Sequence, residues 1–186
     1  MSIRFFSISK FRLRVPVLLL VLPIWGFAQT PDFGWAKRAG GNDSDSSRAI
    51  AADRMGNCYA TGWFIGTATF GGTTLTSSGE GDIFVAKYDR AGKVLWARRA
   101  GGGSFDEGSG IAVDDTGNCY VTGYFSGTAT FGGATLTSGG NGEVFVAKYD
   151  SAGNVIWVKH GGGTDEDHGN GIAVDGMGNC YMYAHK

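Results

Sequence analysis

The chain has 186 residues, of which 33 are glycine and three are proline, and its formal net charge is −1. This near balance of charge gives no electrostatic reason to expect binding to nucleic acid or to an anionic membrane surface. The glycines recur at fixed positions along the sequence, which indicates ordered turns and not a disordered segment.

Residues 1–28 have the layout of a secretory signal peptide. A basic start precedes an apolar run over residues 15–27, and Gly26-Phe27-Ala28 offers a small-x-small cleavage site. This run is too short to span a hydrocarbon layer, which needs about 20 residues, and we expect no membrane span elsewhere. The sequence therefore predicts a secreted mature chain (extracellular, at the cell surface or periplasmic). Its formal charge is −5, because the leader holds four of the 16 basic residues and none of the 17 acidic ones.

A repeat of 61 residues organises the rest of the chain. Three tryptophans and three cysteines keep this spacing: Trp35, Trp96 and Trp157, and Cys58, Cys119 and Cys180. Whole phrases recur at the same interval, so that Phe-Val-Ala-Lys-Tyr-Asp occupies both residues 84–89 and residues 145–150. A constant register of this kind predicts one structural unit that is stacked several times.

Each repeat contains four short runs that are typical of β-strands. In the second copy they cover residues 110–114, 118–122, 144–149 and 154–158, and all are rich in β-branched and aromatic residues. Asp-x-x-Gly turns join the first run to the second and the third to the fourth, with the aspartate bonding to the backbone and the glycine adopting a left-handed conformation. The strands are apolar on both faces, as in a sheet that is covered by neighbours on both sides. The expected fold class is therefore all-β, with four-stranded antiparallel β-propeller blades.

The repeat resembles the bacterial SBBP β-propeller repeat. The likeness rests on Gly-Asn-x-Tyr-x-Thr-Gly, then Phe-Val-Ala-Lys-Tyr-Asp-x-x-Gly-Asn, then a tryptophan-bearing strand that ends in Gly-Gly. It implies a propeller fold and an exported protein, and it implies no reaction.

The predicted organisation follows from the repeat. Its segments are a signal peptide (1–28), a leading strand of an incomplete blade with its connecting loop (29–47), blade 1 (48–96), an inter-blade loop (97–108), blade 2 (109–157) and a partial third blade (158–186). The repeat pattern is lost soon after Cys180-Tyr181, which indicates a fragment of a longer or frameshifted product. A closed ring needs roughly 4–8 blades, so we expect the incomplete ring to self-associate through its open blade faces.

Three aspartates, Asp45, Asp106 and Asp167, hold one position in the connection from the fourth strand to the next first strand. Such a series could form a ring of carboxylates or oxygen-ligand loops for Ca²⁺. The neighbouring acids change from copy to copy, so the sequence favours an Asx-type turn that braces the crossover between blades. We expect no metal or cofactor. The three cysteines are interpreted as small buried residues, because their spacing suits neither a disulfide nor a zinc site.

The long connection from the second to the third strand is the expected ligand face. It is rich in Thr, Ser and Gly and carries an aromatic residue in each copy, Phe70 and Phe131. Aromatic-bearing loops on a rigid scaffold are common binding sites. Together with Asp45, Asp106 and Asp167, these two phenylalanines are the candidate ligand-face residues.

The predicted function is a non-enzymatic binding or structural scaffold whose partner is a protein or a glycan. No serine lies in a nucleophile motif and nothing fixes two carboxylates across a shared cleft, so no catalytic residue is predicted. Two alternatives stay open at this point. The chain could be a piece of a propeller hydrolase or lyase, or a short chain whose copies close a ring together.

Overall fold

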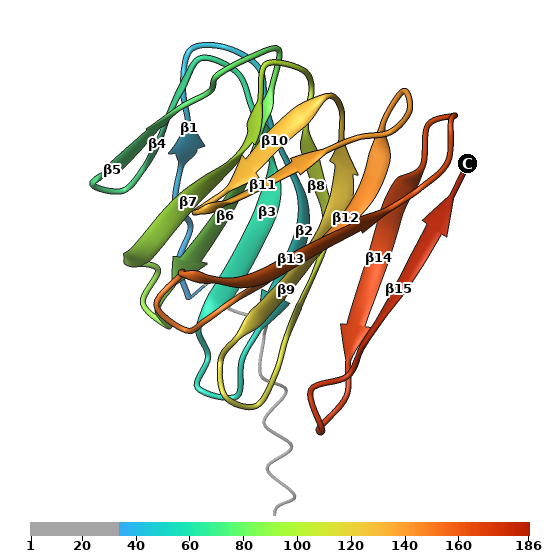
Figure 1. Ribbon diagram of the computed structural model, residues 1–186. Helices are drawn as coiled ribbons and strands as arrows, with labels where there is room; N and C mark the ends of the chain where they lie inside the picture. Colours follow the sequence, from blue (N-terminus) through green and yellow to red (C-terminus); the bar gives the residue numbers. More distant parts are fainter. Residues whose placement is uncertain (1–33) are drawn as a thin grey trace, which may run out of the picture. The chain divides into compact units, whose positions relative to one another are not determined.

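The computed structural model describes residues 34–186, so the predicted signal peptide lies outside the described residues. This part of the chain is built of β-strands and turns and contains no helix, as the sequence predicts (Figure 1). It accordingly contains no helix that is long and apolar enough to cross a membrane.

Two complete four-stranded antiparallel blades and one half-blade follow one another along the chain. Blade 1 consists of β2 (Asp45–Ala52), β3 (Cys58–Phe64), β6 (Asp82–Tyr88) and β7 (Val94–Gly102). Blade 2 consists of β8 (Glu107–Val113), β9 (Cys119–Phe125), β12 (Glu143–Tyr149) and β13 (Val155–Gly161). The half-blade consists of β14 (His168–Val174) and β15 (Cys180–His185). The first strands β2, β8 and β14 lie side by side, so the blades stack face to face and form an incomplete propeller.

The tight turns work as the sequence predicts. In the turn between β8 and β9, Asp114 Oδ1 accepts hydrogen bonds from the backbone N–H groups of Thr116 (3.0 Å) and Asn118 (2.9 Å). Gly117 has a φ of +81°, a conformation that side-chain-bearing residues rarely adopt. The other four Asp-x-x-Gly turns repeat this arrangement.

The connection from the second to the third strand is not a loop. It folds into a hairpin of β4 (Thr67–Phe70) and β5 (Thr73–Thr76) in the first copy, and of β10 (Thr128–Phe131) and β11 (Ala134–Thr137) in the second. Strand β10 then pairs antiparallel with β7, the outer strand of the preceding blade. Strand β4 pairs in the same way with β1 (Ala39–Gly40), which lies in the predicted leading segment. Each hairpin therefore extends the sheet of the repeat before its own.

The larger apolar core lies between blades 1 and 2. It joins blade 1 side chains such as Tyr59, Ile83 and Val85 to blade 2 side chains such as Phe125 and Phe145. All five are at most 1% exposed. Because each sheet has two apolar faces, a blade is fully buried only between two neighbours.

Replacing Phe131 by alanine measures how much the hairpin's contact with this core contributes to the free energy of unfolding. The Phe131 ring is fully buried, with its centroid 4.8 Å from that of Phe145. We expect Phe131→Ala to lower the free energy of unfolding by about 3–5 kcal/mol, the usual cost of a large buried cavity. The matched control, Thr130→Ala on the opposite hairpin face, should cost no more than about 1 kcal/mol. Urea unfolding followed by tryptophan fluorescence measures both, and equal costs would contradict the assignment.

Candidate functional site

The three crossover aspartates brace the chain where it passes from one blade to the next. The Oδ2 atom of each accepts a hydrogen bond from the backbone N–H of the residue four positions earlier. The donors are Gly41 for Asp45 (2.6 Å), Gly102 for Asp106 (2.7 Å) and Gly163 for Asp167 (2.7 Å). The aspartates thus brace the crossover, but by a bond to an earlier residue and not by the expected Asx-type turn, in which the side chain bonds to a later N–H. Across residues 34–186, no three His, Cys, Asp or Glu side chains gather closely enough to hold a metal ion.

Around Asp106 the structure brings together charged residues that the repeat pattern did not single out. Asp82, at the start of β6, pairs with Arg99 on β7, with 2.5 Å between Oδ2 and the guanidinium Nη1. Asp82 and Asp106 are both fully buried, and an oxygen of each lies 2.8 Å from the point that a Cβ at Gly101 would occupy. Two buried carboxylates therefore lie close together with one guanidinium.

Burial dominates the electrostatics of this acidic pair. It raises the pKa of Asp106 to about 7, against the opposing effect of hydrogen bonds from the N–H groups of Gly102 and Ser126. The neighbouring Asp82 raises the pKa of Asp106 further, and Arg99 lowers it. Burial also raises the pKa of Asp82, whose Oδ1 is buried without a hydrogen-bond partner among the described residues. The pair thus favours a state in which one carboxyl keeps its proton near neutral pH.

The joint between blade 2 and the half-blade carries a related cluster. Glu143 and His160 occupy the positions 61 residues after Asp82 and Arg99, and the histidine Nδ1 contacts the Glu143 carboxylate. The hydrogen bond from His160 lowers the pKa of Glu143, and Asp167 raises it slightly. An acid–base–acid arrangement therefore recurs at both joints, although its residue types change.

Neither of the two candidate aromatic residues lies on the exposed face of its hairpin. Phe70 is 2% exposed and Phe131 is fully buried, and each packs on the phenylalanine of its own third strand, Phe84 or Phe145. The expectation of an exposed aromatic side chain in this segment is therefore wrong. The cause is the strand alternation of the hairpin, which turns Phe toward the core and threonine toward solvent.

The exposed face of each hairpin carries two cross-strand pairs of threonines. The pairs are Thr67–Thr76 and Thr69–Thr74 in the first hairpin, and Thr128–Thr137 and Thr130–Thr135 in the second. In three of the four pairs the hydroxyl oxygens lie 3.4 Å apart. We call these eight side chains the threonine faces. The sequence prediction used only the polar composition of these segments.

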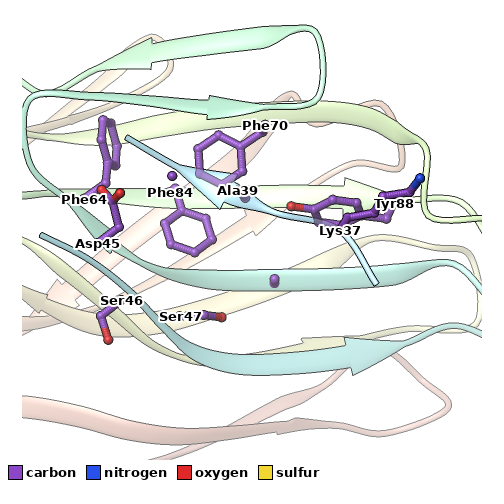
Figure 2. Close-up of a pocket in the computed structure, with 11 residues that line it drawn as sticks. Lys37, Ala39, Asp45, Ser46, Ser47, Phe64, Phe70, Phe84 and Tyr88 are labelled. Atoms are coloured by element: carbon purple, nitrogen blue, oxygen red, sulfur yellow. The ribbon is translucent and has the colours of Figure 1, made fainter. Parts of the chain in front are cut away.

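A cavity opens on the outer face of blade 1. It holds about 670 Å³ of empty space that is open to solvent. The rings of Phe64, Phe70 and Phe84 gather at one end of it, and Lys37 and Tyr88 lie at the other (Figure 2). The residues 61 positions after the three phenylalanines line the joint between blades 1 and 2, where blade 1 side chains cover them. The cavity is therefore the place where a preceding blade would pack.

The interpretation of the cysteines as small buried residues holds for Cys119 and only in part for Cys58 and Cys180. All three are free, with Cys119 fully buried and the other two half-buried. Burial raises the pKa of the Cys119 thiol to about 12, so it stays protonated and is a poor nucleophile or metal ligand at neutral pH.

The raised pKa of Asp106 leads to a pH prediction. A carboxyl whose pKa is higher in the folded than in the unfolded protein stabilises the fold at low pH, and this contribution is lost as the pH rises from about 4 through about 7. Asp106→Asn removes the titration but keeps an oxygen for the Gly102 N–H. We expect the melting temperature of the variant to rise relative to wild type between pH 5 and pH 8. Asp45→Asn is the matched control at the equivalent brace, and a difference that does not change with pH would refute the prediction.

The comparisons with known proteins agree with this geometry. Residues 95–124 match the sequence model of the SBBP family, a beta-propeller repeat. An uncharacterized WD repeat-containing protein of Acanthamoeba polyphaga mimivirus is 33% identical over 94 residues, which cover 45% of this chain and 7% of that protein. The regulatory protein FlaEY of Caulobacter vibrioides is 31% identical over 125 residues, which cover 63% of this chain and 13% of that protein. The chain thus spans only a small part of either relative. Fold and comparisons together indicate a repeat-protein scaffold built of β-propeller blades.

Proposed function

We propose that this protein is an exported, non-enzymatic scaffold that binds a glycan or a protein through its threonine faces, as part of a longer propeller-repeat assembly. The observation that carries the proposal is the alternation of the hairpins. The apolar side chains of each hairpin pack against its blade. Threonines face the other way, at equivalent positions in the two repeats.

The geometry of a threonine face suits a ligand with closely spaced polar groups. Side chains directly opposite one another on paired strands have Cβ atoms about 4.5–5.5 Å apart. Each threonine offers a hydroxyl that both donates and accepts, beside a methyl group that packs against apolar surface. Sugars and extended peptides present a similar mixture of hydroxyl or amide groups and C–H surface.

The polar residues that recur in the repeats have structural roles, which supports a scaffold over an enzyme. The turn aspartates cap their own turns, and the crossover aspartates brace the chain between blades. The buried hydroxyls of Thr61 and Thr122 both donate to the carbonyl of a phenylalanine on the neighbouring strand, at 2.8 Å. The hydroxyl proton of each of these threonines is therefore engaged in a structural hydrogen bond.

A glycan array tests the ligand surface. The probe is the mature chain, and the test variant combines Thr69→Val, Thr74→Val, Thr130→Val and Thr135→Val, which keep shape and strand propensity but remove four hydroxyls. We expect the variant to lose at least about tenfold in affinity for any glycan bound by wild type, or about 1.4 kcal/mol. The control, Thr164→Val, removes an exposed threonine outside the hairpins and should bind as wild type does. Equal binding by the fourfold variant would refute the surface, and release of cleaved sugar would refute the non-enzymatic role.

Export is proposed from the basic and apolar layout of residues 1–28. The protein recovered from the periplasm, the cell surface or the medium of an expressing cell should begin at or near Gln29. N-terminal sequencing measures this directly. A protein that stays in the cytoplasm with Met1 or Ser2 at its start would refute export.

A further inference from the structure

The two joints inside the chain use the same contacts. The Tyr59 hydroxyl on β3 donates to the carbonyl of Gly117 in the first turn of blade 2, at 3.1 Å. The Tyr120 hydroxyl on β9 donates in the same way to Gly178 in the first turn of the half-blade, at 3.3 Å. Both tyrosines are fully buried. A blade therefore presents a tyrosine on its forward face, and the next blade receives it at its first turn.

The half-blade carries the second-strand part of this forward face, without the side chains of a third and fourth strand, and nothing in the described chain covers it. Tyr181 follows Tyr120 by 61 residues and is 62% exposed, and Tyr183 beside it is 68% exposed. Among residues 34–186 the Tyr181 hydroxyl bonds only within its own hairpin, to Asp175 at 3.3 Å. We call Tyr181 and Tyr183 the forward patch.

Blade 1 carries the matching receiving face, which lies open at Ile50, whereas Phe64 and Phe84 on the same face are buried. Ile50 is 70% exposed, whereas the residue 61 positions later, Ile111, is 8% exposed inside the joint. The cavity lined by Phe64 and Phe84 opens on the same blade (Figure 2). Within the described residues β1 pairs along one edge only, with β4, whereas its counterpart β7 pairs along both edges. We call Ile50 and this cavity the receiving patch.

We propose that the forward patch of one copy of this chain packs on the receiving patch of a second copy, head to tail. The two patches are the two halves of a joint that the chain already forms twice, so their shape and polarity are matched by the repeat itself. In the proposed contact Tyr181 donates to the carbonyl of Gly56, the counterpart of Gly117 and Gly178. The half-blade supplies the first two strands of a shared blade, and the segment 34–41 of the second copy supplies the fourth.

Such a contact joins two different surfaces, so it must either close a ring or continue as a filament. Two copies supply four complete blades and two shared ones of three strands each, about six in all, which lies within the usual range for a closed propeller. The contact therefore favours a closed dimer. It is independent of the ligand surface proposed above, because the threonine faces belong to neither patch.

Light scattering coupled to size exclusion tests the proposal on the mature chain at about 1–100 µM. We expect wild type to form a dimer. Tyr181→Arg and Ile50→Arg should each weaken association at least tenfold, because each places an unpaired charge in an apolar contact. Ile156→Arg is the control, since Ile156 is 51% exposed on β13 and lies on neither patch. Circular dichroism checks that each variant keeps the wild-type fold.

Mixing the two patch variants tests the head-to-tail polarity. The Tyr181→Arg chain keeps an intact receiving patch and the Ile50→Arg chain keeps an intact forward patch, so an equimolar mixture should recover a heterodimer with one intact joint. A patch that pairs with itself would show no such recovery. A monodisperse wild-type monomer at 100 µM, an equal effect of Ile156→Arg, or a mixture without recovery would each overturn the proposal.

Discussion

Apolar packing between neighbouring sheets is the interaction on which this structure depends. A single blade has two apolar faces, and burying one of them leaves the other in water. At about 25 cal/mol per Å² of apolar surface, an uncovered face forgoes a large part of the free energy that could stabilise the fold. In the core between blades 1 and 2 both facing surfaces are covered, and Tyr59 and Val85 of one repeat share this core with Phe125 of the next. The smaller cluster on the outer face of blade 1 draws only on side chains of one repeat.

Polar residues hold the sheets in the register that this packing needs. Their environments shift the pKa of two such aspartates, Asp114 and Asp106, in opposite directions. At Asp114, burial raises the pKa, but hydrogen bonds from Thr116 and Asn118 outweigh it and bring the pKa to about 2. The charged form of Asp114 therefore stabilises the turn. Asp106 makes a similar backbone hydrogen bond in a buried place beside Asp82, and there burial wins. Aspartate is thus favoured as the charged form in the turn at Asp114. Between blades 1 and 2, at Asp106, burial shifts the equilibrium toward the neutral acid.

Much of the fold could be predicted from the sequence because the repeat is long and its turns have a simple mechanism. The 61-residue register and the Asp-x-x-Gly turns define four strands per blade, and the strands appear where they were expected. The hairpin was missed although its pattern was readable, since Thr-Ala-Thr-Phe-Gly-Gly-Thr-Thr-Leu-Thr alternates polar and apolar residues around a glycine turn. The prediction of a loop rested on the polar composition of this segment and not on its alternation. It therefore missed the burial of Phe70 and Phe131.

Other features lay beyond the reach of the sequence pattern. The pairing of β10 with β7 joins two repeats through backbone hydrogen bonds, which any side chain can accompany. The ion pair of Asp82 with Arg99 becomes Glu143 with His160 in the next copy. Both pairs join an acidic to a basic side chain, but their residue types differ. Identical residues at a spacing of 61 therefore do not reveal them. The bracing role of the crossover aspartates, in contrast, followed from their constant position.

The stagger of the hairpins has a consequence for how such a chain can change its length. Since β10 completes the sheet of the preceding repeat, the sheet and the sequence repeat have different boundaries, and no repeat is self-contained. A duplication or deletion of 61 residues, begun at any point, restores every strand partner on both sides of the join. A change of one residue more or fewer within a strand would turn its apolar side chains to the opposite face. After unequal recombination, only chains that gained or lost whole repeats would keep their strand partners and fold. Such chains are therefore expected to change length by whole repeats.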